Sequence, residues 1–341
     1  MQQVRGERGE RVMKKLVLLF LCVVLVPCAF ASDPAAAKKE GTANFYANIT
    51  AVEPIMDAFT AASGVKGVYT RISTTKYLAT VLTEFQAGKL EADLLQGPLP
   101  ILQALKEKGV LAAYRSPSAA GYPAWASQDD TIVQFGIEYV ALIYNKNLVK
   151  PGDVPKEYKD LADPKWRDKI VMPDPSSHAT TISWLVGLKE AGVFASDKEW
   201  RDFLKGLAAN NPMFVNSFSP TPAPVESGEK LIAISMPKYI ITHAKAPLDW
   251  ARTGLLLGTP RGVAIAARAP HPNAARLFMD YWLSRDAMKL LADKVGEYVL
   301  APGVFPPIEG IDKVKVVPIR ELSDKEIGSW GKEFRKIFSA R

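Results

Sequence analysis

Along most of this 341-residue chain, short continuous apolar runs alternate with stretches in which apolar residues recur every three or four positions. This alternation predicts strands interleaved with helices. Each short apolar run is followed by a stretch with apolar residues every three or four positions. That stretch usually ends at a glycine, as at Gly64, Gly88 and Gly109. The strands predicted in this first series span residues 43–48, 67–71 and 92–95. Three strand–helix units in this order predict half of an open parallel sheet.

A second series follows a loop at 151–164 that is rich in proline, aspartate and lysine. Before it, the apolar run at 131–144 exceeds the usual strand length of about 5–6 residues, so we predict that the chain passes here from one lobe to another. Residues 262–267 are predicted to return, and Pro272 to open one long helix over 273–295. The strands predicted in this second series span residues 169–172, 213–215 and 231–235. Together the two series predict an α/β fold.

The first 31 residues have the pattern of a signal peptide, which predicts export to the periplasm. A basic start precedes an apolar run at 16–26 that is shorter than a membrane span of about 20 residues, and a small-residue cleavage pattern ends at Ala31. A retained membrane anchor is the alternative. Both cysteines, Cys22 and Cys28, lie in this leader, so the mature chain is predicted to have no disulfide. Five basic and two acidic residues leave with the leader, which changes the formal net charge from +7 to +4.

Sequence motifs of catalysis are missing from the chain. There is no G-x-S-x-G, no H-E-x-x-H, no P-loop and no dinucleotide fingerprint, and three histidines without a mature cysteine make a transition-metal site hard to assemble. The basic residues form no dense stripe with interleaved aromatics, so nucleic acid is not an expected partner. We therefore expect a binding protein without enzymatic activity or cofactor. A secreted hydrolase is an alternative, because catalytic residues can lie far apart in sequence.

Polar turns follow the predicted strands, at the sheet edge where α/β proteins bind ligands. The most informative turn is 174–181, where Asp-Pro-Ser-Ser leads directly into a helix whose first N–H groups and positive dipole end suit an anion. An ordinary N-cap at Ser177 or Thr180 is the alternative there. For Arg71 the alternative is a surface ion pair, and for Lys238 it is a surface charge. The candidate ligand-binding residues are Thr50, Arg71, Ser73, Thr74, Gly97, Ser176, Ser177, His178, Ala179, Thr180, Asn216, Lys238 and Tyr239.

Four stretches of the chain resemble the extracellular solute-binding proteins of ABC importers, in the branch that includes bacterial ferric-ion-binding proteins. They are 64–111 (with GKLEADLL and LKEKGVLAAY), 144–145 with 161–181, 247–250, and 270–284. The resemblance implies a type II-like periplasmic-binding-protein fold, with two lobes, mixed sheets and a cleft between the lobes that clamps the solute. On this basis the expected lobes are 42–130 plus 260–305 and 140–258 plus 306–341, with crossing strands near 131–144 and 255–265.

The resemblance also bears on the ligand. Iron-binding members present two adjacent tyrosines, a His and a Glu as ligands. In this chain the tyrosine pair falls on Lys238-Tyr239, the His position near Ile49-Thr50 and the Glu position near Gly97-Pro98. Three of the four protein ligands are therefore absent, and the Lys238 ammonium opposes a ferric ion. The anion-binding turn of those proteins matches 176–179, and a second polar contact matches Asn216.

From the residues and the resemblance together we expect the periplasmic component of an ABC transporter. It captures a small anionic solute, such as an organophosphate, a phosphonate or a carboxylate, by lobe closure. Its expected partner is the permease in the inner membrane, and the chain is expected to be a monomer. The alternative is ferric iron, bound through Tyr239 with a synergistic anion; otherwise no metal site is expected.

Overall fold

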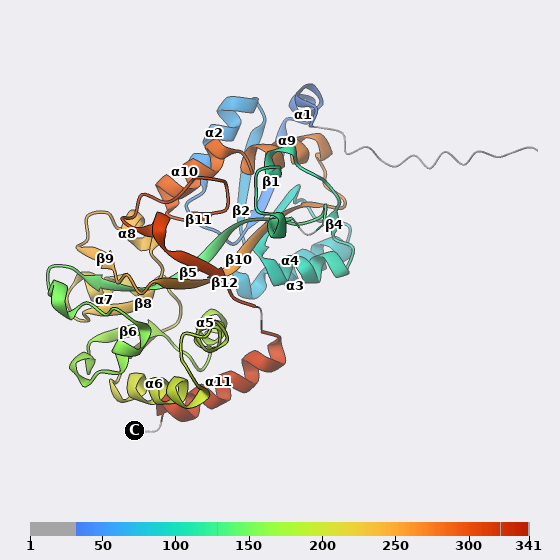
Figure 1. Cartoon of the computed structure of the whole chain (residues 1–341). Helices are drawn as coiled ribbons and strands as arrows, with labels where there is room; N and C mark the ends of the chain where they lie inside the picture. The colour runs from blue at the N-terminus through green and yellow to red at the C-terminus, as the bar shows by residue number, and fades with distance from the viewer. Residues whose placement is uncertain (1–31, 128, 321, 340–341) are drawn as a thin grey trace, which may run out of the picture. The chain divides into compact units, whose positions relative to one another are not determined.

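Two long strands, β5 (Val133–Asn145) and β10 (Leu255–Ala266), run antiparallel through the middle of the fold (Figure 1). The computed structural model describes residues 32–339 apart from 128 and 321, so the predicted signal peptide lies outside the described residues. The sheet order is β2-β1-β3-β10-β5-β8-β6-β7, so that β5 and β10 join the strands of the first series to those of the second. The long strand predicted at 131–144 is thus β5, and the run at 262–267 lies at the end of β10.

The first series builds one end of this sheet. β1 (Thr42–Ala47) pairs in parallel with β2 (Lys66–Arg71) and β3 (Leu94–Pro98), as predicted, and β3 pairs antiparallel with β10. Phe45, Phe59 and Phe278 pack together on one face, and Tyr77 and Leu102 lie in a second core on the other. The helices that follow the three strands are α2 (Glu53–Ser63), α3 (Thr74–Gln86) and α4 (Leu99–Glu107).

The second series builds the other end. β6 (Ile170–Pro173) pairs in parallel with β7 (Met213–Val215) and β8 (Ile232–Ser235), and β8 pairs antiparallel with β5. Buried Trp184, Trp200 and Phe334 lie in the core between this part of the sheet and its helices. Those helices are α5 (Ala179–Glu190), α6 (Asp197–Ala209) and α11 (Asp324–Ser339).

The prediction of one long helix over 273–295 is wrong. The structure has two helices, α9 (Pro272–Trp282) and α10 (Arg285–Val295). Ser284 between them has extended backbone and accepts a hydrogen bond from the backbone N–H of Ala287, which makes it the N-cap of α10. The apolar spacing continues through this break, so the spacing alone did not reveal it.

Several short elements were not predicted. β9 (Leu248–Trp250) and β11 (Tyr298–Val299) add to β5, while β4 (Leu111–Ala112) and β12 (Lys315–Pro318) add to β10. The short helices are α1 (Pro34–Glu40), α7 (Pro222–Glu226) and α8 (Lys238–Thr242). The 3-10 turns are Pro117–Ala119, Ala124–Ala126, Pro151–Asp153, Tyr158–Ala162, Pro164–Trp166 and Ile311–Lys313. None of the helices described between residues 32 and 339 combines the length and hydropathy needed to cross a membrane.

Candidate functional site

A groove lies where helices from both series begin. Thr74 at the start of α3, Leu99 at the start of α4 and Ala179 at the start of α5 all line it, and its volume is about 280 Å3. The N-terminal end of a helix carries a partial positive charge, because its first N–H groups have no partner within the helix. Three such ends at one groove favour a negatively charged ligand.

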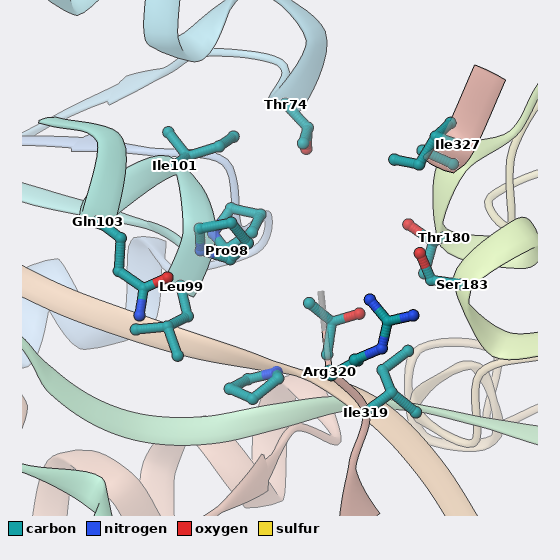
Figure 2. Close-up of a pocket in the computed structure, with 14 residues that line it drawn as sticks. Thr74, Pro98, Leu99, Ile101, Gln103, Thr180, Ser183, Ile319, Arg320 and Ile327 are labelled. Carbon is teal, nitrogen blue, oxygen red and sulfur yellow. The ribbon is translucent and has the colours of Figure 1, made fainter. Parts of the chain in front are cut away.

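Side chains from different parts of the chain face one another across this groove. Figure 2 shows Pro98 and Ile101 on one side and Thr180 and Ser183 on the other, and Pro260 of β10 adds to the lining. The hydroxyls of Thr180 and Ser183 therefore lie on the side formed by α5. On the side formed by α4, the apolar residues Pro98, Leu99 and Ile101 outnumber the one amide, that of Gln103, and Thr74 and Thr259 add hydroxyls from other elements. This asymmetry sets which part of a ligand each side can hold.

The start of α5 is held by the turn before it. The Asp174 side chain accepts a hydrogen bond from the Ser176 N–H at 2.8 Å, and the Asp174 carbonyl accepts one from the His178 N–H at 2.8 Å. His178 is the N-cap, and its Nδ1 accepts from the Thr181 N–H at 3.3 Å. The N–H groups of the two residues between, Ala179 and Thr180, have no acceptor among the described residues. Two backbone donors are thus available at the groove.

His178 contributes to this geometry through its own ring. Burial lowers the pKa of His178, which favours the neutral imidazole that an accepting Nδ1 requires. The same Nδ1 lies 2.9 Å from the Thr181 hydroxyl, and the ring meets Phe218 edge-on at 5.1 Å between centroids. The ring is therefore fixed in place as a helix cap.

Four charged residues lie together beside the start of α8, and we call them the charge cluster: Glu138 of β5, Lys238 of α8, Arg261 of β10 and Glu297. Arg261 donates to Glu138, and its Nε lies 3.8 Å from Glu297. Lys238 Nζ lies 3.3 Å from Glu297 and 3.9 Å from Glu138. The side chains of Arg261 and Glu297 are both only 3% exposed. Two cations and two anions leave the charge cluster without formal net charge.

The charge cluster also sets the protonation of Glu138 and leaves part of Arg261 unbonded. Burial raises the pKa of Glu138, but the charges of Arg261 and Lys238 outweigh burial and hold that pKa below its ordinary value. The Arg261 Nε and Nη1 atoms are buried without a hydrogen-bond partner among the described residues.

Gly296 permits the close approach of Lys238, because a Cβ there would lie 2.7 Å from the Lys238 Cα.

Tyr239 lies next to the charge cluster. Burial, and then the carboxylates of Glu138 and Glu297, raise the pKa of its phenol, so the neutral form is favoured. Its ring meets that of His243 edge-on, with 5.7 Å between centroids. Among residues 32–339, with 128 and 321 left out, no group of three or more His, Cys, Asp or Glu side chains is arranged to hold a metal ion.

The structure brings only some of the predicted ligand-binding residues together. Thr74, Ala179 and Thr180 line the groove, and Gly97 is buried next to Pro98, which also lines it. Lys238 is an internal partner of the charge cluster, so it is not a surface charge. The remaining predicted residues do not line the groove. Ser176 is half-buried, with its carbonyl against Gly331 of α11, and His178 and Tyr239 lie where described above. The others are exposed: Thr50, Arg71, Ser73, Ser177 and Asn216.

Sequence reasoning missed three members of the charge cluster, Glu138, Arg261 and Glu297. A usable signal existed for two of them. Glu138 interrupts the apolar run VQFGIEYVALIY, and Arg261 interrupts LLLGTPRGVAIA. A charged residue inside a strand that is otherwise apolar on both faces needs a partner of opposite charge, because burial of an unpaired charge is costly. The sequence does not show which residue that partner is.

Comparison with known proteins gives a consistent result. The family model described as "Bacterial extracellular solute-binding protein" matches residues 54–315. Iron uptake protein A2 of Synechocystis is 29% identical over 197 residues, which cover 50% of this chain and 52% of that protein. The chain thus spans about half the length of this curated relative in the alignment.

Solved structures show the same fold over a larger share of the chain. The substrate binding protein of an ABC transporter from Agrobacterium tumefaciens has a TM-score of 0.73 at 14% identity, covering 88% of this chain and 96% of that one. The periplasmic binding protein AfuA of Actinobacillus pleuropneumoniae, with exogenous fructose-6-phosphate bound, has a TM-score of 0.65 at 22% identity, covering 87% and 97%. These likenesses confirm the predicted two-lobed periplasmic-binding-protein fold.

Proposed function

This chain belongs to the family of bacterial extracellular solute-binding proteins, and we propose that it is the periplasmic component of an ABC importer that captures a small anionic solute. The proposed solute class is an organophosphate, a phosphonate or a carboxylate. We take residues 42–130 plus 260–305 as one lobe and 140–258 plus 306–341 as the other. The solute enters between them and undergoes no chemical step.

The observation that carries this proposal is the start of α5 within the groove. The N–H groups of Ala179 and Thr180 have no acceptor among the described residues, and the hydroxyls of Thr180 and Ser183 lie on the same side (Figure 2). N–H and O–H donors next to a helix N-terminus are the usual contacts of a phosphate or carboxylate group. Thr74, from the other lobe in this division, adds a hydroxyl oxygen that accepts from the Asn48 side chain at 3.0 Å.

Contacts from both lobes give a reason for closure. A solute bound to Thr180 alone does not distinguish an open from a closed form, whereas one that also touches Thr74 and Pro98 binds the closed form better. That difference in affinity drives the lobes together. We propose that the closed form docks on the permease. The Sinorhizobium fredii protein named "Probable ABC transporter periplasmic-binding protein y4fP" is 27% identical over 223 residues, which supports this class of partner.

A ligand screen tests the proposal. Thermal unfolding of the purified chain is followed with inorganic phosphate, phenylphosphonate or benzoate, and with neutral phenol as the control. At a concentration 100 times its Kd, a bound anion stabilises the folded chain by about 2.7 kcal/mol, so its melting temperature rises clearly. If no anion in the panel raises it, or if phenol raises it equally, the proposal of an anion site is wrong.

Ferric iron is the second candidate, and one observation favours it. The Tyr239 phenol lies near the carboxylates of Glu138 and Glu297, and such oxygen donors suit a hard cation. Iron uptake protein A2 is also a relative. Two cationic groups, Lys238 and Arg261, stand in the same place and oppose a ferric ion. Iron held by Tyr239 gives a visible tyrosinate-to-iron absorption band, which Tyr239→Phe removes; a colourless chain after loading with ferric citrate counts against this candidate.

A further inference from the structure

The two sides of the groove offer different numbers of hydrogen-bond donors. Pro98 and Pro100 stand at the cap and in the first turn of α4, and a proline has no N–H group. The start of α5 has no proline, and both Ala179 and Thr180 keep free N–H groups. The dipole of α4 still points at the groove, but its hydrogen-bonding capacity is reduced.

Apolar side chains extend the side formed by α4. Leu99 lies between the two prolines, Ile101 follows them, and Pro260 of β10 also lines the groove. Ile319, which precedes α11, and Ile327, within α11, add apolar surface on the opposite side of the groove, next to α5 (Figure 2). These residues come from three separate parts of the chain, so the apolar surface is a product of the fold.

The position of this surface relative to α5 limits the ligand. A group that accepts hydrogen bonds is best placed at Ala179 and Thr180, and the rest of a ligand in this groove of about 280 Å3 then contacts Pro98, Leu99 or Ile101. Hydroxyl groups placed there lose water, and among the lining residues α4 offers them only the Gln103 amide as a side-chain partner, so their burial is costly. Hydrocarbon placed there gains contacts without that loss.

We propose that the solute is an anion with an apolar body, that is, a phosphate, phosphonate or carboxylate that carries an aliphatic or aromatic group. This rests on the proposed function and narrows it. The negative group binds at the start of α5, and the hydrocarbon lies against α4 and Pro260. A polyhydroxylated phosphate matches the donors at the start of α5 but not the apolar surface of α4 and Pro260.

Calorimetric titration with matched ligands tests this inference. Phenyl phosphate and glycerol 3-phosphate carry the same charged group on an apolar and a polar body, and inorganic phosphate carries the head group alone. We expect phenyl phosphate to bind at least about tenfold more tightly than glycerol 3-phosphate, as an apolar group in an apolar pocket does. Leu99→Asn is expected to reduce this ratio. The control Leu148→Asn, at a leucine that is 52% exposed and outside the groove, leaves the ratio unchanged.

The outcomes separate this inference from the function on which it rests. If glycerol 3-phosphate binds as tightly as phenyl phosphate or more tightly, the apolar-body inference is wrong and anion capture stands. If none of the three phosphates binds, anion capture by this site fails and the inference fails with it. The comparison of the three ligands on the unmodified chain decides between these outcomes even where Leu99→Asn does not fold.

Discussion

The groove and the charge cluster are two polar regions that differ in how their polar groups are paired. The groove is lined mainly by N–H groups, hydroxyls and apolar side chains. One formal charge also lines it, the guanidinium of Arg320, which is paired with Glu190 and Glu326. The charge cluster holds four formal charges, and each of them has a partner of opposite sign within 4 Å. The region with more charge is therefore the one with less capacity to attract a ligand.

The difference shows that the buried charges of this protein bind one another, whereas the groups available to a ligand are neutral donors. Buried ions must be paired, since removal of an ion from water costs several kcal/mol. Pairing of Arg261 with Glu138 neutralises both charges where β5 and β10 pair, and it leaves little net electrostatic field. Neutral donors at the start of α5 need no such partner and stay available. Variants of each region test this division.

The largest effect is expected from Arg261→Met. The variant leaves Glu138 and Glu297 buried with only Lys238 to compensate them, so the free energy of unfolding is expected to fall by about 3–5 kcal/mol. Urea denaturation measures it.

Arg201→Met is the matched control, because the Arg201 side chain is 41% exposed and its ion pairs with Asp197 and Glu333 lie at the surface. Only a small change is expected there. Equal losses in the two variants would mean that the charge cluster is hydrated like a surface pair.

A smaller effect is expected from Gly331→Ala in α11. A Cβ at this position would lie 2.7 Å from the Ser176 carbonyl oxygen, so the turn that leads into α5 has to move. We expect a loss of about 1–3 kcal/mol in the free energy of unfolding and weaker binding of phosphate.

Gly328→Ala in the same helix is the control, because a Cβ there meets nothing within 4 Å. This variant is expected to gain about 0.5–1 kcal/mol, since alanine is the better helix former. Destabilisation of similar size by both variants would show that contact with Ser176 is not the cause.

Thr180→Val tests the groove directly. The substitution removes one hydroxyl and keeps the shape, so phosphate binding is expected to weaken by about 1 kcal/mol, or about fivefold, with little change in stability. Thr83→Val, at an exposed position on α3, is expected to bind as the unmodified chain does. Calorimetry that finds equal affinities for both variants would remove Thr180 from the site.

The smallest effect concerns the pH dependence of stability. Burial lowers the pKa of His178, so as pH falls from about 7 towards 5 the unfolded chain binds a proton that the folded chain binds only at lower pH. The free energy of unfolding is therefore expected to fall over this window. His178→Asn keeps an N-cap acceptor that does not titrate and is expected to show a shallower fall. Parallel pH profiles for the two chains would contradict the assignment.

Prediction from the sequence succeeded where local pattern was sufficient. The three strands of the first series pair as predicted, and the strand over 213–215 has the predicted bounds. The turn over 174–181 does open a helix at the groove, but its N-cap is His178. An N-cap at Ser177 or Thr180 was considered only as the alternative to ligand contact there. The break between α9 and α10 was missed because apolar spacing continues through it, and the decisive signal is the backbone conformation of Ser284.

The amino-acid sequence by itself determined the alternation of strands and helices, the long apolar run of β5 and the polar turn before α5, because each depends on residues a few positions apart. Only the tertiary structure decided which charges pair and what lines the groove. Glu138 and Arg261 are 123 positions apart, and Lys238 and Glu297 are 59. The apolar surface of the groove likewise joins residues near 99, 260 and 319. Contacts over such separations follow from how the sheet and its helices pack, which no local pattern encodes.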